Sequence, residues 1–481
     1  MSIRRGITAV RATATTTAAA VVAVGLVLGA AVSAPAVAAP ADDPAVSTPA
    51  EDPYYPAKGD PSVDALHYGL RLHWAPRQRV LTGRAEIRFR APVDESRIQL
   101  DLGKQLVVRR VSVDGARTPF THRGKDLVVE TGPLAAGSRH TLLVAYRGVP
   151  KPVAAPTTRS DVHRLGWTTT ARGEVWTMQE PFGAFTWYPV NDHPSDKAFY
   201  DVRISAPRGM VGIFNGRMAG RRTADGRTVT RWNLDSPAAS YLTTIAIGDY
   251  VRYRDRGPRG LPITYWLPRR DQRALPELRR SPRLIRWLEA RLGPFPFDRV
   301  GAVMVPGWGA METQTLVTMG SRIIADRRDF RAVLLHEYAH QWYGDLVTPD
   351  NWPDLWMNEA FAMYLQFRWE VSRGWVTMEE VRDLLTDLDP SLRKEDGPPG
   401  AYDRTKFAEL CVYYCGALML DRMNTVLGPD LFDQVLREWP QQFPLQSVDR
   451  NDYIAWLSAR TGRDMGPFMT EWLTSPTTPA T

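Results

Sequence analysis

Residues 60–255 alternate between apolar and polar side chains in short runs, and no other feature of the sequence constrains the fold as much. Gly and Pro are frequent between the runs. Because successive side chains of a strand point to opposite faces of a sheet, this alternation predicts strands with one buried face. Many short strands separated by turns are typical of an all-β sandwich. We therefore expect an N-terminal β-sandwich domain over residues 58–255, with its clearest strands at 67–72, 85–90, 140–144, 201–205 and 228–232.

The pattern becomes helical after Pro258. Residues 283–288 form an amphipathic run that Gly293 and Pro294 end, and residues 300–305 form a short apolar strand. Further helices are expected at 352–373, 404–427, 430–438 and 450–460. We therefore expect a multidomain α+β protein whose second domain, residues 256–481, is α-rich and contains a small sheet.

Length and charge narrow the possible functions. The chain has 481 residues, which is too long for a single hydrophobic core, so two or three domains are expected. The formal net charge is only +7, and no basic run is interleaved with aromatic residues. The sequence therefore gives no indication of a nucleic-acid-binding surface.

The N-terminus predicts an exported protein. Arg4, Arg5 and Arg11 precede an apolar stretch over about 18–32, and Ala36-Val37-Ala38 fits a cleavage site. We expect residues 1–38 to be a signal peptide, whose removal lowers the net charge to +4. The protein would then be secreted, without stable membrane insertion. Residues 39–57 are rich in Ala, Pro, Asp and Thr, which predicts a disordered linker.

Two cysteines, Cys411 and Cys415, are the only ones in the chain. They are too few for a disulfide-built scaffold or a thiolate zinc cluster. Four residues apart on a predicted helix, they lie at the edge of disulfide reach. We expect buried free thiols rather than a bridge.

Residues 336–340 read His-Glu-Tyr-Ala-His, which is the H-E-x-x-H pattern. On a helix, His336 and His340 lie on one face and can reach the same metal ion. Glu337 then projects nearby, where it can take a proton from water at the metal. The sequence therefore predicts a zinc hydrolase with Glu337 as general base.

The third zinc ligand is expected to be a carboxylate, because no histidine follows His340. The next predicted helix offers Asp354, Glu359 and Glu370. Glu359 lies in an apolar setting, where a bare charge needs a partner. The metzincin class, which needs a histidine six residues after His340, is excluded because Leu346 stands there.

Two stretches resemble the gluzincin aminopeptidases of the aminopeptidase N and leukotriene A4 hydrolase type. The first is residues 336–342 together with Glu359, which follows His340 after 18 intervening residues. The second is Gly309-Ala310-Met311-Glu312, which is similar to the family's exopeptidase motif. The resemblance covers about residues 59–479. It implies a thermolysin-like catalytic domain, one zinc ion per chain and the ligand set His336, His340 and Glu359.

The resemblance also implies roles for substrate-binding residues. Glu312 and Glu180 would hold the free α-amine of a peptide, and Gly309, Ala310 and Met311 would lie along its backbone. Tyr413 would stabilise the oxyanion, with Tyr414 as the alternative. The sequence departs from the family at Thr313 and Asp345, where asparagine is usual, and at Cys415, where lysine is usual. It also ends soon after residues 468–473, so the family's large helical C-terminal domain is not expected.

These features lead to one main hypothesis and two alternatives. The main one is a secreted, monomeric zinc aminopeptidase that acts on peptide or protein N-termini. A thermolysin-like endopeptidase would also use the zinc site, but Glu312 and Glu180 argue against it. The departures at Thr313 and Cys415 allow a third reading, a binding protein that has lost catalysis.

Overall fold

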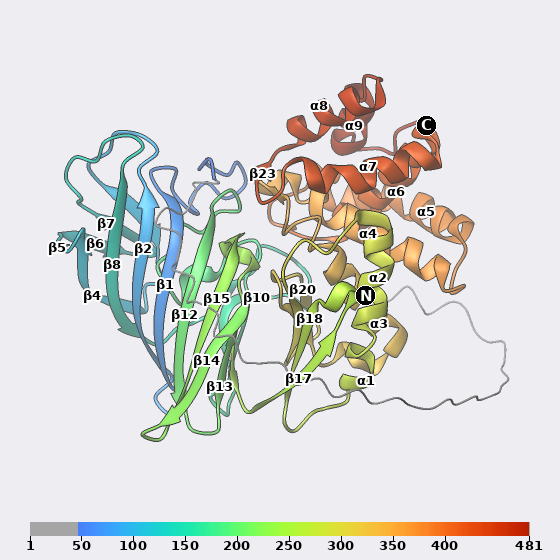
Figure 1. The fold of residues 1–481 in the computed structure, drawn as a ribbon. Helices are drawn as coiled ribbons and strands as arrows, with labels where there is room; N and C mark the ends of the chain where they lie inside the picture. Colours follow the sequence, from blue (N-terminus) through green and yellow to red (C-terminus); the bar gives the residue numbers. More distant parts are fainter. Residues whose placement is uncertain (1–46, 481) are drawn as a thin grey trace, which may run out of the picture. The chain divides into compact units, whose positions relative to one another are not determined.

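A computed structural model describes residues 47–480. The predicted signal peptide and residues 39–46 of the predicted linker lie outside the described residues. The first half of the described chain consists of β-sheets and the second is mostly helical (Figure 1). The predicted fold class, a β domain followed by an α-rich domain, is confirmed. Between residues 47 and 480, every helix is too short or too polar to cross a bilayer.

An eight-stranded sheet dominates the β half. Along β1, Tyr68, Leu70, Leu72 and Trp74 are buried while Arg71 is exposed, as the predicted alternation requires. β1 pairs in parallel with β12 and antiparallel with β2. In sheet order the strands are β14 (Arg217–Ala224), β15 (Arg227–Ala239), β12 (Lys197–Pro207), β1 (Asp64–Ala75), β2 (Val80–Arg90), β8 (Arg139–Gly148), β4 (Leu106–Val113) and β5 (Ala116–Arg117).

A five-stranded sheet packs against the inner face of the large sheet. Trp74 of β1 meets Trp167 of β10 edge to face, with ring centroids 5.2 Å apart, so the two sheets share a core. The order of this second sheet is β13 (Val211–Phe214), β16 (Ile245–Gly248), β11 (Val175–Met178), β10 (Arg164–Thr169) and β9 (Val153–Ala154). A smaller sheet contains β3 (Ile98–Asp101), β7 (Asp126–Val129) and β6 (Phe120–Arg123).

The second half contains its own five-stranded sheet. The order is β17 (Tyr250–Arg256), β18 (Pro262–Pro268), β19 (Val300–Val305), β21 (Val317–Gly320) and β20 (Ala310–Met311), so β20 is an edge strand. The predicted domain boundary after residue 255 falls within β17. This strand pairs with β18 and therefore belongs to the sheet of the second half. A short pair, β22 (Thr348–Pro349) and β23 (Ser447–Val448), joins the loop after α3 to the C-terminal helices.

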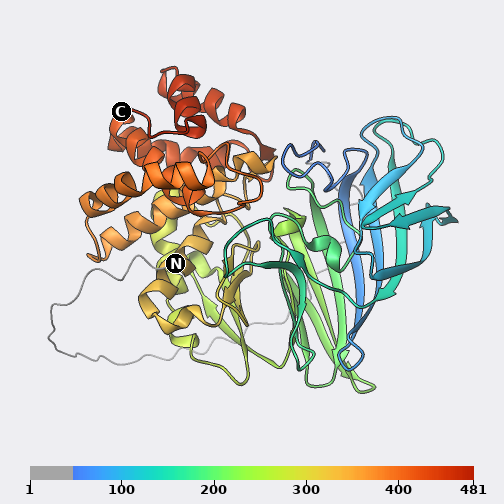
Figure 2. The ribbon, with the colours of Figure 1, turned by 180° about the vertical axis from the view of Figure 1, so that it is seen from behind.

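The helices lie together beside this sheet, as the reverse view shows (Figure 2). They are α1 (Leu275–Leu278), α2 (Ser281–Leu292), α3 (Arg327–Ala339), α4 (Trp356–Ser372), α5 (Met378–Asp396), α6 (Leu410–Leu427), α7 (Pro429–Gln442), α8 (Arg450–Thr461) and α9 (Gly466–Thr474). α5 is not among the helices predicted from the sequence, although Thr377 and Glu380 form a capping box at its start. Pro390 in its interior hides the helical pattern.

The predicted disorder of the linker is wrong for residues 47–57. Asp52 is fully buried, and its carboxylate accepts N–H groups of Trp352, Tyr54 and Tyr55. Tyr55 packs on Phe182, and its hydroxyl donates to the Arg404 carbonyl. The composition suggested disorder, but a buried carboxylate with three donors and two packed tyrosines fixes the segment.

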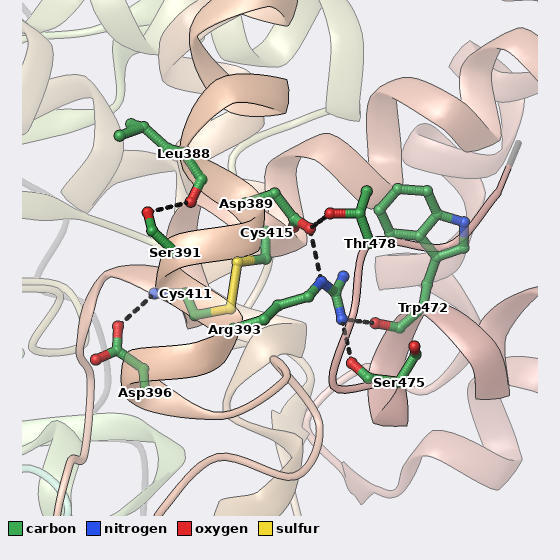
Figure 3. Close-up of a disulfide and its surroundings, with 10 residues drawn as sticks. All are labelled: Leu388, Asp389, Ser391, Arg393, Asp396, Cys411, Cys415, Trp472, Ser475 and Thr478. Atoms are coloured by element: carbon green, nitrogen blue, oxygen red, sulfur yellow. Dashed lines mark hydrogen bonds and ion pairs between the residues drawn. A yellow bond between two sulfur atoms is a disulfide. The ribbon is translucent and has the colours of Figure 1, made fainter.

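The prediction of free thiols is also wrong, because a disulfide joins Cys411 and Cys415 (Figure 3). One helical turn brings their Cα atoms to 4.8 Å, which lies within the usual disulfide range. Both residues are buried against Leu388 and Leu392 of α5.

Candidate metal centre

Helices α3 and α4 bring the three predicted metal ligands together. Asp326 caps α3 by accepting the N–H groups of Arg328 and Asp329. His336 and His340 then lie one turn apart with ring centroids 4.7 Å from each other. Glu359, in the first turn of α4, has Oε2 at 3.2 Å from His336 Nε2 and 3.5 Å from His340 Nε2. All three side chains are buried.

This donor set fits one zinc ion. Two imidazole nitrogens and one carboxylate oxygen lie within 4.8 Å of one another, and catalytic zinc usually takes three protein ligands and keeps one open position. His340 Nδ1 lies 3.0 Å from the Tyr343 carbonyl and donates to it, which leaves Nε2 as a lone-pair donor. Without a metal ion, burial raises the pKa of the Glu359 carboxyl, but the neighbouring His340 and His336 lower it more, so the carboxylate is ionised before a metal binds.

Glu337 lies beside this set without belonging to it. Its side chain is buried, and burial raises the pKa well above the usual value. His340 opposes that rise, while the carboxylates of Glu312 and Glu359 add to it. A carboxylate with a raised pKa is a stronger base, which suits a residue that takes a proton from water.

Glu180 and Glu312 form a second cluster with Glu359, which is also one of the three predicted zinc ligands. Their nearest carboxylate oxygens lie within 4.8 Å of one another. Glu180 follows β11 of the β half, and Glu312 follows β20. Oε1 of Glu180 and Oε1 of Glu312 are buried without a hydrogen-bond partner. Burial and the neighbouring carboxylates raise the pKa of Glu180. Unpartnered acceptors gathered in this way suit an ammonium group.

Residues 309–311, predicted to lie along the substrate backbone, are at the edge of the five-stranded sheet of the second half. Ala310 and Met311 make up β20, which pairs on one side with Met319 and Thr318 of β21. An extended peptide could add to the other side as a further strand. Gly309 precedes this edge, and its carbonyl accepts the Gly320 N–H.

Gln341 joins the metal helix to this segment. Its side chain is fully buried, and Oε1 accepts the Thr315 N–H at 2.9 Å. Nε2 donates to the Glu312 carbonyl at 2.7 Å. The residue directly after His340 therefore holds both ends of segment 312–315. This role was not predicted from the sequence, although the position of Gln341 directly after H-E-x-x-H was a signal for it.

Tyr413 and Tyr414 point in different directions from α6. The Tyr413 ring is stacked near the His336 ring, with centroids 6.0 Å apart. Tyr414 instead packs against Phe367 and beside the disulfide. A Cβ on Gly416 would lie 2.5 Å from Cβ of Ala360, so α6 crosses α4 very closely one turn after Tyr413. This close crossing brings Tyr413, and not Tyr414, to the metal ligands.

The β half also contributes Arg159, which the sequence analysis missed. Its Nη1 donates to the Tyr413 hydroxyl at 3.2 Å. An arginine in a loop after β9, more than two hundred residues from its partner, carries no local signal. Only the tertiary structure reveals it.

The departures from the family pattern leave the ligand set intact. Thr313 is fully buried and bonds to Leu316 and Thr318, so it faces inward. Asp345 is buried, and the Lys197 ammonium donates to the Asp345 and Leu346 carbonyls. Cys415 is in the disulfide, on the side of α6 that faces α5.

Comparisons with known proteins match both halves of the chain. The protein-family model for the peptidase M1 N-terminal domain matches residues 64–242, and the family model for the peptidase family M1 domain matches residues 277–472. The chain is 24% identical over 413 residues to probable aminopeptidase 1 of Saccharolobus solfataricus, covering 80% of this chain and 50% of that protein. It is 23% identical over 426 residues to leukotriene A-4 hydrolase of Xenopus laevis, covering 81% of this chain and 67% of that protein.

A solved structure covers nearly the same extent as the described chain. A variant of the M1 zinc metallopeptidase of Deinococcus radiodurans, bound to a Tyr-Ser-Ala substrate, superposes with a TM-score of 0.79 at 26% identity. The match covers 89% of this chain and 98% of that one. By contrast, the chain spans half or less of the length of the first three curated relatives. The M1 models match both domains in order and the three zinc donors converge in the second, so the chain belongs to peptidase family M1.

Proposed function

We propose that the protein is a secreted zinc aminopeptidase that removes residues from the free N-termini of peptides. The observation that carries this proposal is the pair Glu180 and Glu312. Each has a buried carboxylate oxygen without a partner, and both converge with the ligand Glu359. A free α-ammonium would supply the missing donors and the missing positive charge. A blocked or internal peptide nitrogen would bring at most one N–H donor and no positive charge.

The side chains around the donor set can divide the work of amide hydrolysis. A zinc ion held by His336, His340 and Glu359 supplies Lewis acidity, which polarises the scissile carbonyl and makes water more acidic. Glu337 takes the proton from the attacking water and returns it to the leaving amine. Tyr413 donates a hydrogen bond to the carbonyl oxygen as negative charge develops there. Ala310 and Met311 hold the substrate backbone along the edge strand.

The relatives support this function. Several curated relatives are aminopeptidases, and the Deinococcus enzyme is bound to a tripeptide. Because the chain spans only part of the curated relatives, their activity is carried to this protein as a proposal. Export rests on residues 1–38, and the proposed monomer rests on the sequence alone.

Two alternatives make different predictions. A thermolysin-like endopeptidase uses the same zinc donors but has to pass peptide chain through the position of Glu180 and Glu312. A binding protein without catalysis would show no turnover at all. The free-amine requirement distinguishes the first alternative, and the effect of Glu337 distinguishes the second.

The test uses aminoacyl reporter substrates and matched peptides with free and acetylated N-termini. We expect chelator-sensitive release of N-terminal residues from the free peptides only. Glu337→Gln should lose at least about a thousandfold in kcat and still bind zinc, as metal analysis would show. Equal cleavage of the acetylated peptides would rule out the amine site. Equal inactivity of wild type and Glu337→Gln across the panel would favour the binding protein.

A further inference from the structure

Residues 156–162 of the β half form a strap that touches the helical half at both of its ends. At one end, Thr157 and Thr158 make three hydrogen bonds to the Glu409 carboxylate at the start of α6. At the other end, a Cβ on Gly309 would lie 3.5 Å from Cγ2 of Val162. The strap therefore connects the N-terminus of α6 with the segment that leads into β20.

Arg159 occupies the middle of this strap, and its guanidinium is almost fully engaged. Nε and Nη2 donate to the two carboxylate oxygens of Asp161 at 3.1 and 2.8 Å. Nη1 donates to the Ala408 carbonyl at 2.8 Å and to the Tyr413 hydroxyl at 3.2 Å. A guanidinium has five N–H donors, so four bonds within the protein leave little capacity for a substrate carboxylate. This arrangement suits a residue that acts on its neighbours.

The Ala408 carbonyl, which accepts a hydrogen bond from Arg159, belongs to a strained residue of the backbone. Ala408 has a φ of 54°, in the left-handed region that residues other than glycine rarely adopt. It lies two residues before α6 begins at Leu410. Arg159 therefore stabilises the entry into the helix that carries Tyr413.

The contact with Tyr413 leaves the tyrosine proton free. The hydroxyl oxygen accepts from Arg159, and the Tyr413 O–H donates no hydrogen bond to any residue within 47–480. A phenol that accepts a bond from a cation becomes a stronger donor, because the bonds polarise one another. The Arg159 charge also lies over the Tyr413 ring, 5.7 Å from its centroid.

We propose that Arg159 is a positioning residue that fixes Tyr413 and strengthens its hydroxyl as a hydrogen-bond donor to the substrate carbonyl. This inference rests on the proposed peptidase function. It implies that the β half takes part in catalysis, because the residue that prepares the oxyanion donor comes from a strap between β9 and β10. Arg159 would act in the reacting state more than in substrate binding.

A double-mutant cycle between Arg159 and Tyr413 tests the proposal. Arg159→Met removes the charge and the donors, and Tyr413→Phe removes only the hydroxyl. We expect Arg159→Met to lower kcat by about 10- to 100-fold with KM within about threefold, the range for a charge-assisted hydrogen bond. In the Tyr413→Phe background the same change should alter kcat by less than about threefold, because residues that act as a unit are not additive. Arg159→Lys should recover part of the loss.

The controls separate positioning from folding. Arg270→Met also breaks an arginine–carboxylate pair, but the Arg270 guanidinium donates to Glu174 and not to a residue of the metal centre, so kcat should not change. If Arg159→Met fails to fold, Asp161→Asn keeps the cation and loosens its orientation, and its effect should again vanish in Tyr413→Phe.

Three results would overturn the proposal. One is an equal loss of kcat from Arg159→Met in both backgrounds, and another is a change confined to KM. The third is a normal kcat for Tyr413→Phe while Glu337→Gln is inactive. In that third case the peptidase function would stand and the role of Arg159 would fall. If Glu337→Gln kept full activity, the proposed function itself would fail.

Discussion

Gln341 offers the most direct test of how the metal helix and the proposed amine site are joined. Replacement by methionine keeps the length of the side chain but removes both polar atoms. The Thr315 N–H and the Glu312 carbonyl then lose their partners inside the protein. Each unsatisfied buried group costs about 1–3 kcal/mol, so the two together should lower the free energy of unfolding by about 2–6 kcal/mol.

The backbone around Gln341 makes this cost hard to avoid. Thr315 has a φ of 63°, an unusual conformation for a β-branched residue. Such strain persists only where neighbouring contacts fix it, and the Gln341 amide supplies one of them. Without that contact we expect segment 312–315 to relax and to move Glu312 away from the amine site. The kcat/KM for free-amine substrates should then fall by about 10- to 100-fold.

Urea unfolding of the chelator-treated protein measures the stability change without any contribution from zinc. Steady-state kinetics of the zinc-loaded variant measure the functional change. Gln366→Met is a matched control, because Gln366 is a partly exposed helical glutamine bonded to Glu370. It should change stability by less than about 0.5 kcal/mol. A Gln341→Met protein within that same margin, with normal kcat/KM, would refute the reasoning.

Three further predictions concern the surroundings of the site. Asp389 and Arg393 are a fully buried pair that ties α5 to the Trp472 and Ser475 carbonyls (Figure 3), so Asp389→Asn should cost about 3–5 kcal/mol in urea unfolding. Asp433→Asn, which breaks the exposed pair of Arg368 and Asp433, should cost under about 1 kcal/mol. If the two substitutions lowered the free energy of unfolding equally, the burial argument would be contradicted. Burial lowers the pKa of Lys197 to about 7, with Asp345 opposing, so the unfolded chain binds the extra proton between about pH 7 and pH 10 and stability should rise with pH in that window. The comparison is made in an Asp345→Asn background, because Asp345 titrates in the opposite sense. Between about pH 7 and pH 9 the free energy of unfolding of the protein with Lys197 should rise by about 2 kcal/mol relative to Lys197→Met, and a difference that stays constant with pH would contradict the prediction. The disulfide predicts no titratable thiol in the unfolded, unreduced protein, and reduction should lower the stability by about 2 kcal/mol; two reactive thiols before reduction would contradict the bridge.

Local sequence patterns predicted the parts of this protein that depend on neighbours along the chain. Alternation over 60–255 predicted the strands, because a strand has only two faces. The spacing of His336 and His340 predicted two donors on one face, because a helix repeats every 3.6 residues. α5 was missed where Pro390 broke the local pattern.

Other features depend on contacts between distant segments. Composition alone suggested disorder for residues 47–57, but Asp52 finds its donor on Trp352, 300 positions away. Nothing local distinguishes Tyr413 from Tyr414; the close crossing of α4 and α6 at Gly416 does.

Glu359 as the third ligand was implied by the resemblance to the family. The sequence by itself determined that His336 and His340 share one face of a helix and that the chain divides into a β half and a helical half. Both follow from short-range geometry that any helix or strand imposes. The tertiary structure alone decided that Arg159 reaches Tyr413 and that Lys197 binds the loop after the metal helix, and it placed Glu180 beside Glu312 as the resemblance had implied. These contacts join the β half to the helical half, and no periodicity in the chain encodes them. They exist because packing the two halves together brings charged groups out of water, where each needs a partner.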